Sequence, residues 1–372
     1  MSQKKAKVLH LGAGVIYGGV ESFLASIARY STETDPSFVL CSEGRLQLEL
    51  LAANRRVEVL PQVRLSRPWL VQRARRALNR FLDQHEFDIA QFHSAWVQIL
   101  FAPVLRRRNI PFTAWIHGVS SNRNWIERLA RRHSPLRVFT ASHFLADVTK
   151  EWYPGVPRQL IAIPVAQPPL VTYEQKLLTR QSLNTDSTDV VIMISCRFEP
   201  WKGHELLFRA LALLKDLPGW TLWVAGGAQE PHELRRLELL HSISSDCGIA
   251  NRIRFLGQRT DVPTLLQSAN IHCQPNPEPE PFGIAFVEAL YAGLPVVSTS
   301  IGGALEIVDP TCGILVPPGD IHSLADALRK LITAPELRER LGNAGPRRAI
   351  QLCDPCQQIK ALESGLIAAL LA

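Results

Sequence analysis

Short apolar runs alternate with helical patterns twice along the chain, and this feature constrains the fold most. Such runs, separated by helical stretches, are typical of parallel sheets wound by helices. We therefore predict an α/β protein with one parallel sheet in each half. The predicted strands of the first half are residues 8–11, 38–41, 89–92, 112–116 and 136–139, and those of the second half are residues 190–195, 221–225, 253–256, 271–274, 295–298 and 313–316.

A proline-rich segment separates the two halves. Three prolines fall within Ile163–Pro169, and proline disfavours both helix interiors and strand pairing. We expect an N-terminal Rossmann-like domain over residues 1–165 and a C-terminal one over 166–352, with a ligand cleft at the carboxyl ends of both sheets.

Charge is distributed unevenly between the halves. Residues 1–165 carry a net charge of +11 and residues 166–372 carry −4, which gives the overall +7. The basic half suits an anionic partner, such as an anionic membrane or a phosphorylated acceptor. Nucleic acid is not expected, because no recognised binding motif accompanies the charge.

Residues 69–82 have the pattern of an amphipathic helix. We expect Trp69, Leu70, Ala74, Ala77, Leu78, Phe81 and Leu82 on its apolar face, with Arg73, Arg76 and Arg80 elsewhere. This pattern suits a helix that lies on a membrane surface, and it suits an ordinary domain-surface helix equally well.

Cysteine usage and hydropathy bear on location. The seven cysteines are odd in number and scattered, unlike the dense framework of a secreted disulfide-rich fold. No apolar run approaches the roughly 18 residues that span a bilayer. The expected location is therefore cytoplasmic, with peripheral attachment to the inner face of the plasma membrane as an open alternative.

Two glycine-containing loops carry candidate phosphate sites. Gly12–Glu21 contains Gly18 and Gly19 and leads from the first strand into a helical pattern, so its amides can face a diphosphate or can form a plain turn. Arg197 and Lys202 follow the first strand of the second half, where two cations suit a departing nucleoside diphosphate. No Asp-x-Asp occurs anywhere in the chain, so no metal is expected.

Two carboxylates, Glu280 and Glu288, lie eight residues apart around Gly283 at the start of a helical pattern. A carboxylate before a helix can hold sugar hydroxyls while the helix N-terminus faces a phosphate. The alternative is helix capping followed by one surface glutamate.

Ordered motifs in the second half resemble the retaining GT-B glycosyltransferases of family four. The resemblance extends to the first half through Gly18–Glu21 and His117-Gly118. The motifs that carry it are Ser195–Gly203, Trp223–Gly227, Arg254–Gly257, Glu280–Val297 and Gly302–Glu306. The resemblance also implies that residues 353–372 form a terminal helix, which packs either back on the N-terminal domain or within the C-terminal one.

The resemblance implies a role for each matching residue. Arg197 and Lys202 would hold the donor diphosphate, Glu280 the transferred sugar and Glu288 the ribose. His117 would lie near the reacting sugar. The backbone and loop positions implied in donor binding are Gly18, Gly19, Phe282, Gly283 and Ile284, and Glu306 would help to shape the site.

The implied reaction is transfer of a sugar, of the hexosyl type, from a nucleoside diphosphate sugar to an acceptor hydroxyl with retention and without a metal or other cofactor. The acceptor would be a saccharide or a lipid-linked saccharide in polysaccharide, lipopolysaccharide or glycolipid assembly. A sugar-nucleotide epimerase of the same fold and a non-catalytic nucleotide-sugar-binding protein are the alternatives. Donor base, donor sugar, linkage and oligomeric state stay open at this point.

Overall fold

The computed structural model describes residues 5–14, 18–118, 125–228 and 231–371 of the 372-residue chain. It divides into two compact units. Unit 1 comprises Met1–Pro164 with Asp354–Ala372, and unit 2 comprises Val165–Cys353. The division thus falls within the proline-rich segment on one side and just before the terminal helix on the other.

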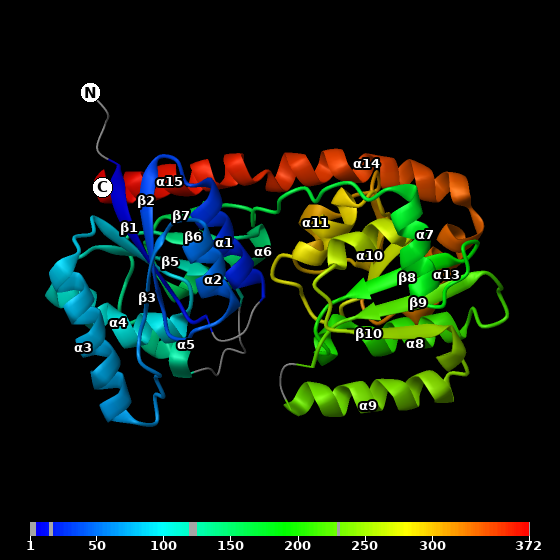
Figure 1. Ribbon diagram of the computed structural model, residues 1–372, viewed down its shortest axis with the longest axis horizontal. Helices are drawn as coiled ribbons and strands as arrows, with labels where there is room; N and C mark the ends of the chain where they lie inside the picture. Colours follow the sequence, from blue (N-terminus) through cyan, green and yellow to red (C-terminus); the bar gives the residue numbers. More distant parts are fainter. Residues whose placement is uncertain (1–4, 15–17, 119–124, 229–230, 372) are drawn as a thin grey trace. The chain divides into compact units, whose positions relative to one another are not determined.

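The described residues of unit 1 form a seven-stranded parallel sheet in the order β3-β2-β1-β4-β5-β6-β7 (Figure 1). The five strands predicted from apolar runs are present, and the two edge strands β3 and β7 were not predicted. Both edge strands are half-buried or exposed, so neither needs an apolar run. The strands are β1 (Ala6–Gly12), β2 (Thr34–Leu40), β3 (Arg56–Val59), β4 (Ile89–Phe92), β5 (Phe112–Ile116), β6 (Val138–Thr140) and β7 (Arg158–Leu160).

Helices cover both faces of this sheet. Leu9 of β1 and Phe92 of β4 pack in one apolar cluster with Ala74 and Leu100, which come from α3 and α4. On the other face, Phe23 of α1 packs against Trp115 of β5. The helices are α1 (Gly19–Tyr30), α2 (Arg45–Ala52), α3 (Pro68–Gln84), α4 (Ala95–Arg107), α5 (Trp125–Ala130), α6 (His143–Val148) and α15 (Pro355–Leu371).

The predicted amphipathic helix is α3, and one of its expected apolar residues is misplaced. The buried residues of α3 are Ala74, Ala77, Leu78, Phe81 and Leu82, whereas Trp69 is 65% exposed. Each residue turns the helix by about 100°, so Trp69 lies about 140° from Ala74 and within about 40° of Arg73. The expectation that Trp69 shares the apolar face is therefore wrong, because Trp69 belongs to the exposed arginine face.

The terminal helix α15 is fastened to the rest of unit 1. The Glu363 carboxylate is buried and accepts hydrogen bonds from the backbone N–H and the hydroxyl of Thr34, both at 2.8 Å. A Cβ atom at Gly365 would lie 2.3 Å from Oε1 of Gln159 and 2.8 Å from Cε1 of Phe139, so a side chain there would force these two side chains to shift. Figure 1 shows α15 running beside β1 and β2.

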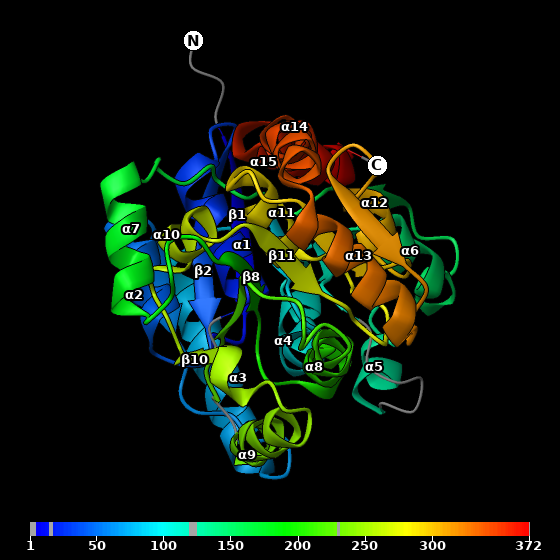
Figure 2. The same cartoon turned by 90° about the vertical axis from the view of Figure 1, so that its right-hand side faces the viewer.

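Unit 2 contains a six-stranded parallel sheet in the order β10-β9-β8-β11-β12-β13 within its described residues. All six strands were predicted. In Figure 1, α8 and α9 lie below the strands and α10 and α11 above them, and Figure 2 shows β11 between α8 and α11. The strands are β8 (Val190–Ser195), β9 (Trp220–Ala225), β10 (Ile253–Gly257), β11 (Ile271–Gln274), β12 (Val296–Thr299) and β13 (Gly313–Val316).

The helices of unit 2 pack around a large apolar core, which includes Phe208 of α8 and Leu328 of α13. They are α7 (Tyr173–Ser182), α8 (His204–Ala212), α9 (Pro231–Asp246), α10 (Val262–Ser268), α11 (Ile284–Tyr291), α12 (Ala304–Ile307), α13 (Ile321–Thr333) and α14 (Pro335–Cys353). Across the described parts of both units, no helix combines the length and apolar character needed to cross a bilayer.

Candidate functional site

An ion pair lies beyond the carboxyl ends of β8 and β11, the two strands at which the strand order of the second sheet reverses. Lys202 ends the short 3₁₀ helix η2 (Pro200–Lys202), and Glu280 lies in the loop before α11. Nζ of Lys202 is 2.7 Å from Oε2 of Glu280. Open α/β sheets bind ligands at such reversal points, so this pair occupies the expected place for a ligand site.

Two amide side chains complete the surroundings of Glu280. Asn276 donates from Nδ2 at 3.0 Å, and Gln274 donates from Nε2 at 3.1 Å, both to Oε2 of Glu280. Their side chains are almost fully buried, so the carboxylate is held by fixed donors. Sequence reasoning missed both residues, although their position at and just after the end of β11 was a usable signal.

Two glycines allow the Glu280 loop to lie against the loop after β12. A Cβ atom at Gly302, which has φ +60°, would lie 2.6 Å from the Glu280 carbonyl oxygen. A Cβ atom at Gly303 would lie 2.4 Å from the Phe282 carbonyl oxygen, and the N–H of Gly303 donates to the Glu280 carbonyl at 2.7 Å. The structure therefore brings Gly302 and Gly303 into direct contact with the candidate site.

The remaining residues of this motif begin α11. Gly283, with φ +110°, precedes the helix, and Ile284 is its first residue. Phe282 is buried, and the first N–H groups of a helix have no partner within the helix. Glu288 lies in the second turn, where burial raises the pKa of its carboxyl group from 4.5 to about 7.

Arg197 does not stand as a free cation beside Lys202. Its Nε lies 2.8 Å from Oε1 of Glu233, and a terminal nitrogen lies 3.2 Å from Oε1 of Glu199. Glu233 comes from α9, and nothing in the sequence pattern pointed to it. The two expected diphosphate cations therefore bind different carboxylates in this structure.

The surroundings of Arg197 also contain a group of possible metal ligands. Ligand atoms of Glu199, His232 and Glu233 lie within 4.8 Å of one another. Arg197 already supplies positive charge to both glutamates, so this group carries no metal assignment.

Glu306 lies in α12, which follows the two glycines directly. Its backbone carbonyl accepts a hydrogen bond from Arg348 of α14 at 2.7 Å. The structure thus places Glu306 in the segment next to the Glu280 loop.

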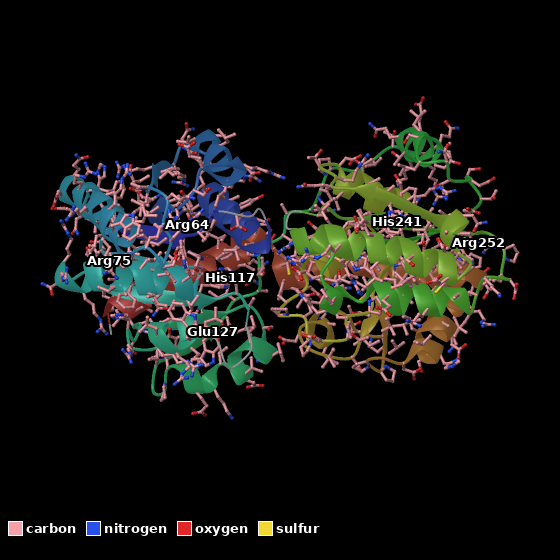
Figure 3. All side chains as sticks on the ribbon, turned by 90° about the horizontal axis from the view of Figure 1, so that it is seen from below. Arg64, Arg75, His117, Glu127, His241 and Arg252 are labelled. Atoms are coloured by element: carbon pink, nitrogen blue, oxygen red, sulfur yellow. The ribbon has the colours of Figure 1, made fainter. Side chains whose placement is uncertain are left out.

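The unit 1 candidates follow the carboxyl ends of β1 and β5. Gly18 precedes α1, Gly19 is its first residue, and Glu21 accepts a hydrogen bond from the Gly18 N–H at 3.0 Å. Residues 15–17 of the predicted glycine loop lie outside the described residues. His117, labelled in Figure 3, follows β5 and meets the ring of Phe23 of α1 edge-on at 5.6 Å. His117 also contacts His93, which sequence reasoning did not select.

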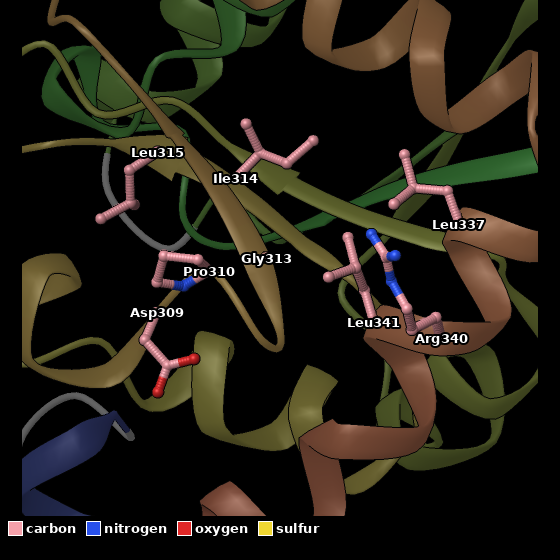
Figure 4. A pocket seen from close by; sticks show the side chains of 8 residues that line it. All are labelled: Asp309, Pro310, Gly313, Ile314, Leu315, Leu337, Arg340 and Leu341. Carbon is pink, nitrogen blue, oxygen red and sulfur yellow. The ribbon is translucent and has the colours of Figure 1, made fainter.

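Unit 2 also contains a pocket that these residues do not line. It has a volume of about 410 Å³ and lies between β13 and α14, as Figure 4 shows. Its walls are mainly apolar, and none of the candidate site residues lines it. We assign it no role.

Both halves of the chain match models of glycosyltransferase families. Residues 175–348 match glycosyl transferases group 1, and residues 17–164 match glycosyltransferase family 4. The chain belongs to these family-four glycosyltransferases. The family assignment made from the motifs is confirmed.

Relatives of known name agree with this family. The lipopolysaccharide core biosynthesis glycosyltransferase LpsE of Rhizobium meliloti is 32% identical over 45% of this chain and 46% of its own length. The phosphatidyl-myo-inositol mannosyltransferase of Mycobacterium leprae is 38% identical over 40% of this chain and 38% of its own length. The aligned regions therefore span less than half of these relatives.

A solved structure matches the fold of nearly the whole chain. Anabaena HepE in complex with UDP-glucose superposes with a TM-score of 0.85, at 25% identity, over 97% of this chain and 100% of that one. The prediction of two Rossmann-like α/β domains of the GT-B class is thereby confirmed.

Proposed function

We propose that this family-four protein transfers a glycosyl unit from a nucleoside diphosphate sugar to an acceptor hydroxyl, with retention and without a metal. The observation that carries the proposal is the contact of Lys202 with Glu280, within a set of buried amide donors at the reversal point of the second sheet. This arrangement offers a carboxylate for sugar hydroxyls and a cation for phosphate in direct contact.

Different residues of unit 2 contact different parts of the donor. Glu280 accepts hydrogen bonds from hydroxyls of the transferred sugar, and Glu288 accepts them from the ribose. Lys202 and the N-terminus of α11 face the diphosphate. Negative charge builds on the diphosphate as its bond to the sugar breaks, so fixed positive groups there favour the transition state.

Arg197 supplies a second cation once the donor diphosphate replaces its present carboxylate partners. Its guanidinium now binds Glu199 and Glu233, and a diphosphate would compete with these carboxylates. The planar guanidinium suits bidentate contact with phosphate oxygens. We assign His117 a contact with the reacting sugar.

The names of similar proteins support a UDP- or GDP-linked donor. HepE was solved with UDP-glucose, and a Corynebacterium glutamicum relative is named a GDP-mannose-dependent mannosyltransferase. The names of other relatives refer to lipopolysaccharide core and phosphatidylinositol substrates. We therefore propose a lipid-linked saccharide or glycolipid as acceptor.

The exposed face of α3 supports attachment to an anionic membrane. Trp69 and the three exposed arginines Arg73, Arg76 and Arg80 share this face, which we call the Trp69 face. An aromatic ring surrounded by arginines suits the boundary between lipid headgroups and acyl chains. Unit 1 would then hold the acceptor side of the reaction near the lipid surface.

The donor is identified by a thermal-shift screen of UDP- and GDP-sugars, followed by assays of transfer and hydrolysis. Transfer with the anomeric configuration retained is expected, together with a large loss in Lys202→Ala and Glu280→Gln. Glu278→Gln is the matched control, because Glu278 is an exposed glutamate two residues from Glu280. Turnover of the donor without any acceptor would indicate an epimerase, and binding without any turnover would indicate a non-catalytic protein.

Liposome sedimentation tests the membrane proposal. Binding to anionic vesicles at low salt is expected to fall in Trp69→Ala and in Arg73→Glu. Arg329→Glu, on the exposed side of α13, changes the net charge equally and is expected to bind as the parent does. Equal, negligible binding to anionic and neutral vesicles would overturn the proposal.

A further inference from the structure

Three histidines form a hydrogen-bonded chain in unit 1. Nδ1 of His10 lies 3.1 Å from Nε2 of His93, and Nδ1 of His93 lies 3.2 Å from Nε2 of His117. His10 belongs to β1, and His93 and His117 directly follow β4 and β5, which are neighbours in the sheet. The chain thus runs across the carboxyl edge of three adjacent strands, where the order of this sheet also reverses.

The surroundings keep these rings uncharged. Burial lowers the pKa of both His10 and His117 to about 3. Burial also lowers the pKa of His93 well below its usual value, and its two histidine neighbours add to that effect. At neutral pH all three rings are therefore uncharged. What can vary is which of the two nitrogens of each ring carries the proton.

Proton counting couples the three rings. A neutral imidazole has one N–H and one nitrogen lone pair. Each of the two hydrogen bonds joins an N–H of one ring to a lone pair of the next ring. If His93 donates from Nδ1 to His117, its Nε2 must accept from Nδ1 of His10, and all three protons lie on Nδ1. If His93 donates from Nε2, all three protons lie on Nε2. The three rings must share one tautomer.

The ends of the chain differ. Nε2 of His10 and Nδ1 of His117 are buried atoms with no partner at hydrogen-bond geometry among the described residues, although the Gln91 side chain lies near His10 and acts to raise its pKa. His10 is 1% exposed, whereas His117 is partly exposed. An unpaired buried polar atom is costly, so a ligand group at His117 would relieve that cost at the end of the chain that lies nearer the surface.

We propose that His10 and His93 are positioning residues whose shared tautomer decides whether Nδ1 of His117 donates or accepts a hydrogen bond. This inference rests on the proposed function in one respect, since that function gives His117 a sugar hydroxyl to contact. A hydroxyl can donate or accept, and the chain selects one of the two without any change of charge. His117 is then presented to the sugar in a fixed orientation and a fixed tautomer.

The geometry distinguishes this chain from a zinc site and from plain packing. Zinc ligands converge on one point at about 2.0–2.1 Å from each nitrogen, whereas these nitrogens pair end to end. Phe23 contacts His93 and His117 through its ring. If His93 served only to pack against Phe23, a phenylalanine at position 93 would serve equally well, because it also offers an aromatic ring.

Nitrogen NMR of the full-length protein with isotope-labelled histidine tests the tautomer rule directly, without any substrate. Neutral rings with the same tautomer are expected for all three histidines at neutral pH. Different tautomers at His10 and His117, a charged His93, or a zinc-induced loss of the ring signals would each overturn the proposal. This outcome is independent of whether the protein transfers sugar.

His93→Phe and His10→Phe test the consequence for turnover. Both keep an aromatic ring and break the chain, so kcat for transfer is expected to fall roughly tenfold while the KM of the donor changes little. His85→Phe is the control, because His85 packs edge-on against Phe81 outside the chain. Parent-like kcat in His10→Phe would overturn the proposal. If His93→Phe does not fold, the kcat of His10→Phe and the NMR result still test the proposal.

Discussion

Nζ of Lys202 lies 2.7 Å from Oε2 of Glu280, and the two side chains are only 15% and 9% exposed. The cation proposed for the diphosphate and the carboxylate proposed for the sugar thus hold each other in place. A donor that draws Lys202 toward its phosphates would at the same moment free Glu280 for sugar hydroxyls. The pair therefore couples the two halves of the proposed donor site.

This pairing predicts a stability cost beyond the loss of activity. Lys202→Ala leaves a buried carboxylate without its cation, which is expected to lower the free energy of unfolding by roughly 3 kcal/mol. Adding Glu280→Gln to that variant should recover much of the loss. Urea denaturation followed by circular dichroism measures both, with Glu278→Gln as the exposed control. Strictly additive effects of the two substitutions would contradict the coupling.

The contact of Gly302 with the Glu280 backbone predicts that this glycine is irreplaceable. Gly302→Ala would place a Cβ atom 2.6 Å from the Glu280 carbonyl oxygen, in addition to the strain of φ +60°. The loop must shift, so donor binding is expected to be lost.

Gly319 provides the matched control for that substitution. It has φ +77°, but no atom lies within 4 Å of the position that a Cβ atom would take. Gly319→Ala therefore carries only the backbone strain, about 1 kcal/mol. Calorimetric donor titration compares the two variants. Parent-like donor affinity in Gly302→Ala would show that the contact does not position Glu280.

Apolar periodicity was enough to predict the central strands, because strands buried on both faces need continuous apolar residues. The edge strands β3 and β7 lie partly in solvent and carry no such run. The prediction for Trp69 was wrong because Trp69 was assigned to the same face as its neighbour Leu70. Trp69 instead lies on the arginine face of the helix. Local patterns thus predicted elements better than the direction of individual side chains.

The candidate site was only partly accessible to sequence reasoning. The motifs selected Lys202 and Glu280, but the partner of each charge depends on which loops the sheet order brings together. Glu233 lies 36 residues after Arg197, and His93 lies 24 residues before His117. Such pairs follow from strand order, which the one-dimensional pattern does not contain.

Metal independence is a further prediction of the proposed mechanism. Positive charge for the diphosphate is expected from Lys202 and Arg197, so transfer should proceed at the same rate in EDTA and in added magnesium. Arg197→Ala should lower kcat/KM by roughly tenfold or more, since a charged hydrogen bond to phosphate is lost. Rate assays after removal of metal by chelation measure this. A rate that is abolished by EDTA and restored by magnesium would contradict it.

The terminal helix α15 should contribute to the stability of unit 1 through Glu363. Its buried carboxylate accepts hydrogen bonds from Thr34 and from the N–H groups of Thr32 and Glu33. Glu363→Gln replaces one acceptor oxygen by an NH₂ group that faces these donors, at an expected cost of about 2 kcal/mol. Lys360→Gln removes only an exposed ion pair with Glu33 and should cost less than about 0.5 kcal/mol. Thermal unfolding distinguishes the two, and equal effects would contradict the role of Glu363.

The half-buried Glu288 predicts a pH dependence of both stability and donor binding. Burial raises the pKa of its carboxyl group from 4.5 to about 7, so the folded protein holds this proton more tightly than the unfolded chain does. Stability should therefore fall as pH rises from 4.5 through about 7, and Glu288→Gln should remove that fall.

Donor affinity should change in the opposite direction, because ribose hydroxyls donate best to the ionised carboxylate. The affinity for the nucleoside diphosphate is thus expected to increase between about pH 6 and about pH 8 in the parent protein, and to stay flat in Glu288→Gln. Calorimetric titrations at the two pH values measure it. An equal increase in both proteins would assign the pH dependence to another group, such as the phosphates of the donor, and would remove Glu288 from the ribose contact.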